Sequence, residues 1–362
     1  MALIAKIRKK LDNFELDTDI QIDDDVLALS GASGAGKTMI LKCIAGIEKP
    51  DSGFISLNGH VLFDSEKKIN VRSALRKTGY LFQDYALFPT MTARENISIV
   101  MKEKNPKLVE KLLASYGLEN VADNYPKKLS GGQKQRVAML RMLASEPECI
   151  LLDEPFSALD EHIKRKMESE LMEMLKDFHK PIIFVSHDRE EIYRFANKVC
   201  FVENGIVSNI YDKNDFFYKP ETCAQAKLAG CLNFSKIRWI DESYVYAVDW
   251  NITLKINYTE KNIWEEYHSI CVFQGDIDRI SSDHIAGKPE IKEKADKDEQ
   301  INIIKIKNVS FVEELYSVCY LCELENGSVI TMIKPGQNKI FSGEYFDVNK
   351  LSIAKKNIHL LK

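Results

Sequence analysis

The sequence predicts an α/β core with an inserted helical subdomain, followed by a separate all-β domain. From residue 1 to about 230, short β-branched or aliphatic runs alternate with helical patterns, which is typical of a sheet covered by helices. After about residue 231, short strands follow one another with no long helix between them. The 362 residues suffice for two or three domains of roughly 150 residues each. We therefore divide the chain into residues 1–230 and 231–362.

The composition is that of a soluble globular protein. Hydrophobic residues make up 45% and charged residues 29%, and 50 Lys plus Arg against 54 Asp plus Glu leave a net charge of −4. This charge gives no basic field for nucleic acid, so we expect no nucleic-acid partner. No apolar run approaches the roughly 18 residues that cross a bilayer, and the N-terminus lacks the apolar core of a signal peptide. We expect a cytoplasmic protein whose membrane role, if any, is peripheral.

Within the first domain, the elements follow a parallel-sheet pattern. Val26–Ser30 reads as a strand that runs into a Gly-rich turn and then a helix closed by Gly46. Cys149–Leu152 and Ile182–Val185 read as buried parallel strands, separated by the charged amphipathic stretch EHIKRKMESELMEMLKDFH. Residues from about 84 to 140 are mainly helical. They predict a helical subdomain inserted into the α/β core.

The second domain reads as a small, OB-like barrel or a pair of them. Its strand candidates include KIRWID, YVYAVDW, ITLKINY and SVCYLCEL, and Asn326-Gly327 is a hairpin turn signal. Residues 286–300 are densely charged, which favours a solvated loop.

Eight cysteines are scattered along the chain, mostly inside apolar runs, so we expect them to be reduced and structural. Cys319 and Cys322 form a C-x-x-C pair, for which a metal or redox site is the alternative reading. A zinc site of this type needs a second pair of ligands at a set spacing, and a strand points residues three apart to opposite faces. A structural strand is therefore favoured.

A phosphate-binding loop follows the first buried strand. GASGAGKT matches G-x-x-x-x-G-K-[ST] and lies between a strand and a helix, as the chemistry requires. The glycines allow backbone N–H groups to form an anion nest at a helix start, while the lysine can reach the β- and γ-phosphates and the threonine hydroxyl can ligate Mg²⁺. This indicates a P-loop NTPase. The residues are Gly31, Ala32, Ser33, Gly34, Ala35, Gly36, Lys37 and Thr38.

The run ILLDE supplies carboxylates at the end of a buried strand, where metal and phosphates bind in such sheets. Asp153 is predicted as the metal-side carboxylate. Glu154 is predicted as the general base that polarises the attacking water.

A second helix start suited to phosphate binding indicates which class of NTPase this is. In LSGGQ, Ser130 is a good N-cap, and Gly131 and Gly132 let backbone amides approach an anion. At this point the sequence resembles the ATP-binding cassette (ABC) ATPases, whose signature is LSGGQ. The signature residues are Leu129, Ser130, Gly131, Gly132 and Gln133.

The remaining motifs of this family appear in the family's order. Gln83 in YLFQDYALFP resembles the Q-loop glutamine, and His187 in FVSHD resembles the switch histidine. The resemblance implies catalytic roles for Glu154, His187 and Gln83, and an Mg²⁺ site at Thr38, Gln83 and Asp153. The residues that resemble the D-loop are Ser157, Ala158, Leu159 and Asp160.

The resemblance also implies a head-to-tail dimer in which the phosphate loop of one cassette and the signature of the other close on one ATP. This chain has one of each, so a two-fold homodimer would complete two sites. Family members usually stack adenine on an early aromatic residue; Phe14 is the candidate, and a core role for it is equally open.

The spacing of the motifs and a closer family resemblance indicate which kind of ABC ATPase this is. About 90 residues separate the loop from the signature, too few for the coiled coil of a chromosome or repair ATPase, and there is one cassette and no membrane span. EPFSALD, DYALFP and LAGCLNFS resemble importer ATPases for oxyanions, most closely the molybdate type with sulfate and tungstate relatives and a TOBE/MOP-like β domain. This implies a motor subunit on the cytoplasmic face of the plasma membrane, with permease subunits and, indirectly, a solute-binding protein. The alternative is a soluble regulatory ATPase with a ligand-binding β tail.

Overall fold

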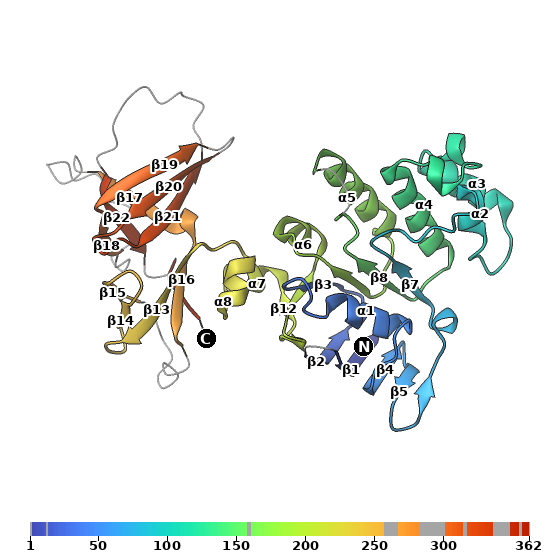
Figure 1. Cartoon of the computed structure of the whole chain (residues 1–362), viewed down its shortest axis with the longest axis horizontal. Helices are drawn as coiled ribbons and strands as arrows, with labels where there is room; N and C mark the ends of the chain where they lie inside the picture. Colours follow the sequence, from blue (N-terminus) through green and yellow to red (C-terminus); the bar gives the residue numbers. More distant parts are fainter. Residues whose placement is uncertain are drawn as a thin grey trace. The chain divides into compact units, whose positions relative to one another are not determined.

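The computed structural model describes residues 2–11, 14–157, 161–256, 267–281, 301–313, 317–335, 348–354 and 357–361. The chain divides into two units, Met1–Lys213 and Asn214–Lys362 (Figure 1). The domain boundary expected from the sequence, between residues 230 and 231, remains a prediction. The units divide earlier because helix α8 (Cys223–Leu228) packs its Ala226 with Cys231 and Cys271 of the second unit.

A twelve-stranded sheet runs through the first unit in the order β6-β5-β4-β1-β2-β11-β10-β3-β9-β8-β7, with β12 paired to β10. Strands β10, β3, β9, β8 and β7 run parallel, which confirms the predicted parallel core. Its parallel strands are β3 (Val26–Ser30), β7 (Thr78–Leu81), β8 (Cys149–Asp153), β9 (Ile182–Val185) and β10 (Lys198–Glu203).

The other half of this sheet is antiparallel, which the sequence analysis did not foresee. Residues alternate between buried and exposed along β1 and β2, so one face packs on the core and the other meets solvent. The remaining strands are β1 (Leu3–Lys10), β2 (Glu15–Ile22), β4 (Ser52–Leu57), β5 (His60–Asp64), β6 (Ile69–Asn70), β11 (Ile206–Val207) and β12 (Tyr211–Asp212).

Helix α1 (Lys37–Ala45) packs into the core shared by the two halves of the sheet. Its Ile40, Leu41 and Ile44 are fully buried in one cluster with residues of both halves. This packing fixes the start of α1, where the phosphate loop ends. Helices α5 (Glu161–Leu175) and α6 (Arg189–Phe195) also belong to this unit, and a 3₁₀ turn covers Ser73–Leu75, whereas α7 (Lys213–Tyr218) begins the second unit.

A helical segment with its own core lies between β7 and β8, where the sequence analysis expects the insertion. Its helices begin at recognisable caps: Thr92 and Ser130 each form a capping box, and Asn105 caps a helix with Pro106 in its first turn. Leu129 of the signature is buried in this core. The elements are α2 (Ala93–Ser98), α3 (Pro106–Ser115), α4 (Gly131–Ala144) and 3₁₀ turns at Glu119–Val121 and Pro126–Lys128.

The second unit is β-rich, as predicted, and its described strands form one five-stranded and two three-stranded antiparallel sheets around one apolar core. Closure into a small barrel stays a prediction. Cys322 is fully buried and Cys319 is not, as expected for opposite faces of a strand. The strands are β13 (Asn233–Trp239), β14 (Tyr244–Ala247), β15 (Ile252–Lys255), β16 (Ser269–Val272), β17 (Ile277–Ser281), β18 (Ile301–Lys305), β19 (Asn308–Glu313), β20 (Ser317–Glu323), β21 (Val329–Pro335), β22 (Val348–Ala354) and β23 (His359–Leu361), with a 3₁₀ turn at Gln274–Asp276.

No helix in the described part of the chain has the length and apolar character needed to span a membrane.

Candidate active site

The phosphate loop leaves β3 and turns into α1 on glycines that no other residue can replace without strain. Gly31 has φ 143°, and a Cβ there would lie 2.1 Å from the carbonyl oxygen of Val202. Gly36 caps α1 in the left-handed region at φ 104°. The backbone N–H groups at the start of α1 are therefore free of side-chain obstruction and form an anion-binding helix end.

Lys37 lies inside this loop. Its Nζ donates hydrogen bonds to the carbonyl oxygens of Gly31 (2.9 Å) and Ala32 (2.7 Å), and the residue is 6% exposed. Burial lowers the pKa of Lys37, while the nearby Glu154 and Asp153 carboxylates oppose this shift. The loop thus holds a buried ammonium group next to two carboxylates.

Asp153 ends strand β8 with both carboxylate oxygens occupied. Its Oδ1 accepts a hydrogen bond from the Thr38 hydroxyl at 2.8 Å, and its Oδ2 accepts one from the Tyr80 hydroxyl at 3.0 Å. Sequence reasoning predicted Thr38 and Asp153 but gave no role to Tyr80, although this residue opens the YLFQDYALFP stretch that contains Gln83.

The Thr38 hydroxyl and the Asp153 carboxylate fit Mg²⁺, because both are hard oxygen ligands. Within the described residues, no group of three or more His, Cys, Asp or Glu side chains is placed to hold a metal by itself. Mg²⁺ in NTP sites uses one or two protein oxygens and takes its other ligands from phosphates and water, so this small donor set is sufficient.

Glu154 follows Asp153 with its backbone in the left-handed region, at φ 46°. Its carboxylate meets two predicted residues from distant segments: the Gln83 Nε2 lies 3.5 Å from Oε2, and the His187 Nδ1 lies 3.8 Å from Oε1. Gln83 also donates to the Ser157 hydroxyl at 3.2 Å, and that hydroxyl donates to the Glu154 carbonyl at 3.0 Å. A hollow of about 130 Å³ borders Glu154 and His187. The structure therefore brings together Gln83, Glu154, Ser157 and His187.

The signature residues Ser130 and Gln133 form hydrogen bonds with each other at the start of α4. The Ser130 hydroxyl accepts from the Gln133 backbone N–H, and the Gln133 side chain accepts from the Ser130 N–H. In the described residues, no hydrogen bond joins Leu129–Gln133 to Gly31–Thr38. Of the predicted D-loop, Ala158, Leu159 and Asp160 lie outside the described residues.

Phe14 lies beside the start of α1. A Cβ at Gly36 would approach the Phe14 Cε2 to 3.4 Å, and a Cβ at Gly205 would approach its Cδ2 to 2.5 Å. The ring is partly exposed next to the phosphate loop.

An ion-pair network that sequence reasoning missed borders the same hollow as His187. The Lys164 Nζ, on α5, lies 2.5 Å from Asp188 Oδ2 and 2.6 Å from Glu191 Oε1. The Ser186 hydroxyl donates to Glu191 and accepts from the Asp188 backbone N–H. Burial alone would lower the pKa of Lys164, but its hydrogen bonds to both carboxylates raise it overall. The network fixes the residues on either side of His187.

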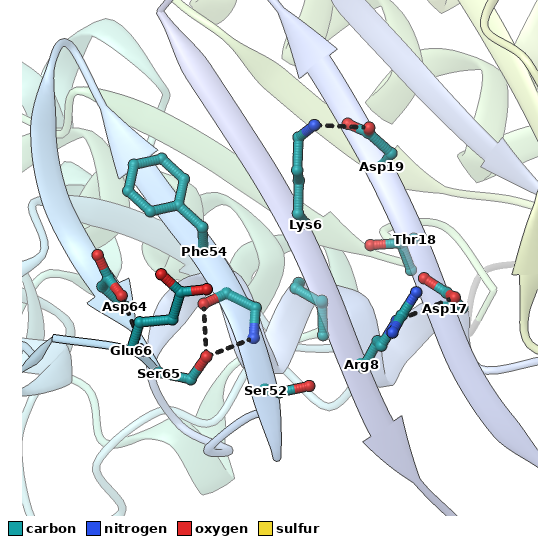
Figure 2. Close-up of a pocket in the computed structure, with 12 residues that line it drawn as sticks. Lys6, Arg8, Asp17, Thr18, Asp19, Ser52, Phe54, Asp64, Ser65 and Glu66 are labelled. Carbon is teal, nitrogen blue, oxygen red and sulfur yellow. Dashed lines mark hydrogen bonds and ion pairs between the residues drawn. The ribbon is translucent and has the colours of Figure 1, made fainter. Parts of the chain in front are cut away.

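A larger hollow, of about 500 Å³, lies on the exposed face of the antiparallel strands (Figure 2). Figure 2 shows that both of its labelled cations are paired across strands: Lys6 with Asp19 at 3.0 Å, and Arg8 with Asp17 at 3.1 Å. These partners occupy both cations, and we assign this hollow no part in the site.

Comparison with known proteins places the chain in a family. Residues 16–157 match the family described as ABC transporter. The molybdenum import ATP-binding protein ModC of Haemophilus influenzae is 39% identical over 212 residues, which are 58% of this chain and 60% of the relative. The Fe(3+) ions import ATP-binding protein FbpC of Haemophilus influenzae is 37% identical over 237 residues, 64% of this chain and 67% of the relative. The sulfate/thiosulfate import ATP-binding protein CysA of Synechococcus elongatus is 37% identical over 239 residues, which are 64% of this chain and 68% of the relative.

A solved structure agrees with these relatives. A dimeric, post-hydrolysis structure of the ATP-binding cassette MJ0796 bound to ADP and Pi is 26% identical, with a TM-score of 0.50, and the match covers 59% of this chain and 99% of that chain. This chain belongs to the ATP-binding proteins of the ABC transporter family. The predicted family resemblance is thereby confirmed. The matched part spans 60% of the length of the ModC relative.

Proposed function

We propose that this chain is the ATP-hydrolysing subunit of an ABC importer. The observation that carries the proposal is the meeting of Lys37, the Thr38–Asp153 pair and Glu154 at the carboxyl end of the parallel strands. Such an end is where α/β sheets bind phosphate ligands.

Each residue has a role that its position supports. The backbone N–H groups at Gly34–Thr38 would bind the ATP phosphates, and the Lys37 ammonium would exchange its carbonyl partners for phosphate oxygens. The Glu154 carboxylate would accept a proton from the attacking water, while Gln83 and His187, which lie next to it, would orient that water. Bound Mg²⁺, held at Thr38 and Asp153, with Gln83 as the further ligand that the family pattern implies, would neutralise phosphate charge.

A homodimer would complete the site. Ser130 and the two following glycines form an open helix start far in sequence from the phosphate loop, and a Cβ at Gly131 would meet nothing within 4 Å. In a two-fold dimer this helix start would bind the ATP held by the other copy. The dimeric state of the MJ0796 cassette supports this arrangement. Phe14, beside the loop, is our candidate for stacking on adenine.

The importer assignment draws on the relatives, which are named as import ATP-binding proteins. The chain would lie on the cytoplasmic face of the plasma membrane, bound to permease subunits that receive solute from an extracytoplasmic binding protein. Two of the three named relatives are assigned to molybdenum and to sulfate or thiosulfate, so we propose an oxyanion, with molybdate as the first candidate and tungstate and sulfate as the others.

Affinity capture from gently solubilised native membranes tests this function. We would capture Glu154→Gln with ATP, which should hold the closed dimer, and compare it with Glu173→Gln, an exposed position on α5. Stoichiometric recovery of a multi-span permease supports the importer, and binding of molybdate, sulfate or Fe³⁺ by the associated solute-binding protein identifies the cargo. Recovery of the homodimer alone contradicts the importer and favours a soluble regulatory ATPase.

A further inference from the structure

Tyr80 reaches the catalytic end of the sheet from a neighbouring strand. Strand β7 pairs in parallel with β8, with Tyr80 opposite Leu151, two residues before Asp153. The Tyr80 hydroxyl donates to Oδ2 of Asp153 at 3.0 Å. The Phe82 ring packs against the Tyr80 ring, with centroids 4.4 Å apart. The phenol is therefore held in place before any ligand binds.

The contact completes the support of one carboxylate. Asp153 is 6% exposed, and each of its oxygens accepts a hydrogen bond from a hydroxyl on a different element: Thr38 on α1 and Tyr80 on β7. A carboxylate held at both oxygens has lost the rotation about its terminal bond. A tyrosine hydroxyl is ordinarily protonated at neutral pH, so the phenol can donate to this carboxylate.

We propose that Tyr80 is a positioning residue for the divalent cation that accompanies ATP: by holding Oδ2 of Asp153, it turns Oδ1 toward the Thr38 hydroxyl and the metal. This inference rests on the proposed function. In this account the Tyr80 hydroxyl on β7 increases metal affinity without contacting the metal. Removal of a residue that forms a hydrogen bond to a metal ligand commonly lowers metal affinity by about 10–100-fold.

The substitution Tyr80→Phe tests the inference because it removes only the hydroxyl. Tyr85→Phe is the matched control: Tyr85 is also buried, and its hydroxyl has no hydrogen-bond partner among the described residues. Both changes are made in the Glu154→Gln chain with ATP, and Mn²⁺ binding is followed by electron paramagnetic resonance. Urea unfolding and metal-free ATP binding report on the fold and on the phosphate loop.

We expect the Mn²⁺ dissociation constant of Tyr80→Phe to rise about tenfold, with that of Tyr85→Phe unchanged and with equal ATP binding without metal. In a double-mutant cycle with Asp153→Asn, the effect of Tyr80→Phe should largely vanish, because Tyr80 acts through Asp153. Two results overturn the role of Tyr80 but leave the proposed function standing. One is an Mn²⁺ affinity for Tyr80→Phe within twofold of its parent. The other is an equal loss of Mn²⁺ affinity when Tyr80→Phe is made in the Asp153→Asn background. Failure of the parent chain to bind Mn²⁺ with ATP overturns the proposed function as well.

Discussion

The side-chain amide of Gln135 donates a hydrogen bond to the carbonyl oxygen of Pro155, 3.1 Å away. Gln135 is fully buried on helix α4, which begins at the signature, and Pro155 directly follows Glu154. One short contact therefore ties the helix that would bind the partner copy's ATP to the segment that carries this chain's own proposed base.

Replacement of Gln135 should reduce hydrolysis more than it reduces ATP binding. Gln135→Met leaves the Pro155 carbonyl without its donor, which costs about 1–2 kcal/mol and loosens the segment next to Glu154. Gln135→Glu should be worse, because it places a carboxylate against that carbonyl. Steady-state phosphate release should show kcat falling about tenfold for Gln135→Met and further for Gln135→Glu, with KM nearly constant. A Gln135→Met chain with the wild-type kcat contradicts this link.

Arg76 should be a major contributor to stability. It is 1% exposed, and its guanidinium donates to the carbonyls of Cys43 and Ile44 at the end of α1, to Val71 and to the Asn70 side chain. Its charge also complements the carboxyl end of the helix dipole. Arg76→Met should lower the free energy of urea unfolding by about 3 kcal/mol or more, because several buried acceptors lose their donor.

The exposed neighbour Arg72 provides the control for this measurement. Arg72→Met should change the unfolding free energy by less than about 0.5 kcal/mol. Equal effects of the two substitutions would show that the buried contacts of Arg76 are not what stabilises α1.

Phe14 should contribute to ATP binding only by stacking on the adenine base, with no effect on phosphate binding. Stacking of an aromatic ring on a base is worth about 1–3 kcal/mol, so Phe14→Ala should weaken ATP binding roughly tenfold while Phe14→Trp retains it. Isothermal titration with inorganic triphosphate separates the base from the phosphates, and its affinity should not change. A loss for triphosphate equal to that for ATP would instead assign Phe14 to the packing of the loop beside Gly36.

Lys164 should set how stability depends on pH. In the folded chain, burial would raise the pKa of Asp188, but the hydrogen bond and charge of Lys164, together with hydrogen bonds from the backbone N–H groups of Glu190 and Glu191, lower it overall. This carboxyl therefore stabilises the fold above its unfolded pKa of about 3.9, and that contribution is lost as pH falls through the lower folded value. In Lys164→Met, Asp188 loses the hydrogen bond and the charge of Lys164 while its burial remains, so its pKa rises. Its stabilising contribution above that pKa becomes smaller, and we expect the stability of the variant to fall less than that of wild type as pH is lowered.

Urea unfolding at pH 3, 4 and 7 checks this weaker pH dependence. Near pH 7, Lys164→Met should lose about 3 kcal/mol, since two partly buried carboxylates lose their cation. Lys166→Met, an exposed position on the same helix, is the control. The neighbouring Glu168 and Arg194 pair is present in every variant and cancels in the comparison. Parallel pH profiles for Lys164→Met and wild type contradict the account.

The sequence analysis found the residues whose positions follow from local chemistry. Gly31–Thr38 lie within one loop and one helix start, and Asp153 and Glu154 end one buried strand, so spacing alone indicates their grouping. The family resemblance added Gln83 and His187, and the structure places both next to Glu154. Three of the parallel strands, β3, β8 and β9, were predictable because their apolar runs are continuous, whereas β7 and β10 were not predicted.

The residues that the analysis missed depend on contacts between distant segments. Tyr80 and Asp153 are 73 positions apart, Arg76 and Cys43 are 33 apart, and Lys164 and Asp188 are 24 apart. Each is a single polar residue in an ordinary helix, strand or turn, and no periodicity marks it. Their partners are decided by the strand order of the sheet, which one sequence does not reveal.

The most direct test of the central claim is phosphate release by the purified chain with MgATP, compared between wild type, Glu154→Gln and the control Glu173→Gln. The account predicts steady release by wild type and by Glu173→Gln, and a loss of about 10²- to 10⁴-fold in Glu154→Gln with ATP still bound. Unchanged release by Glu154→Gln would contradict the assignment of the base. Absence of release by wild type, alone or with its membrane partners, would contradict the function itself.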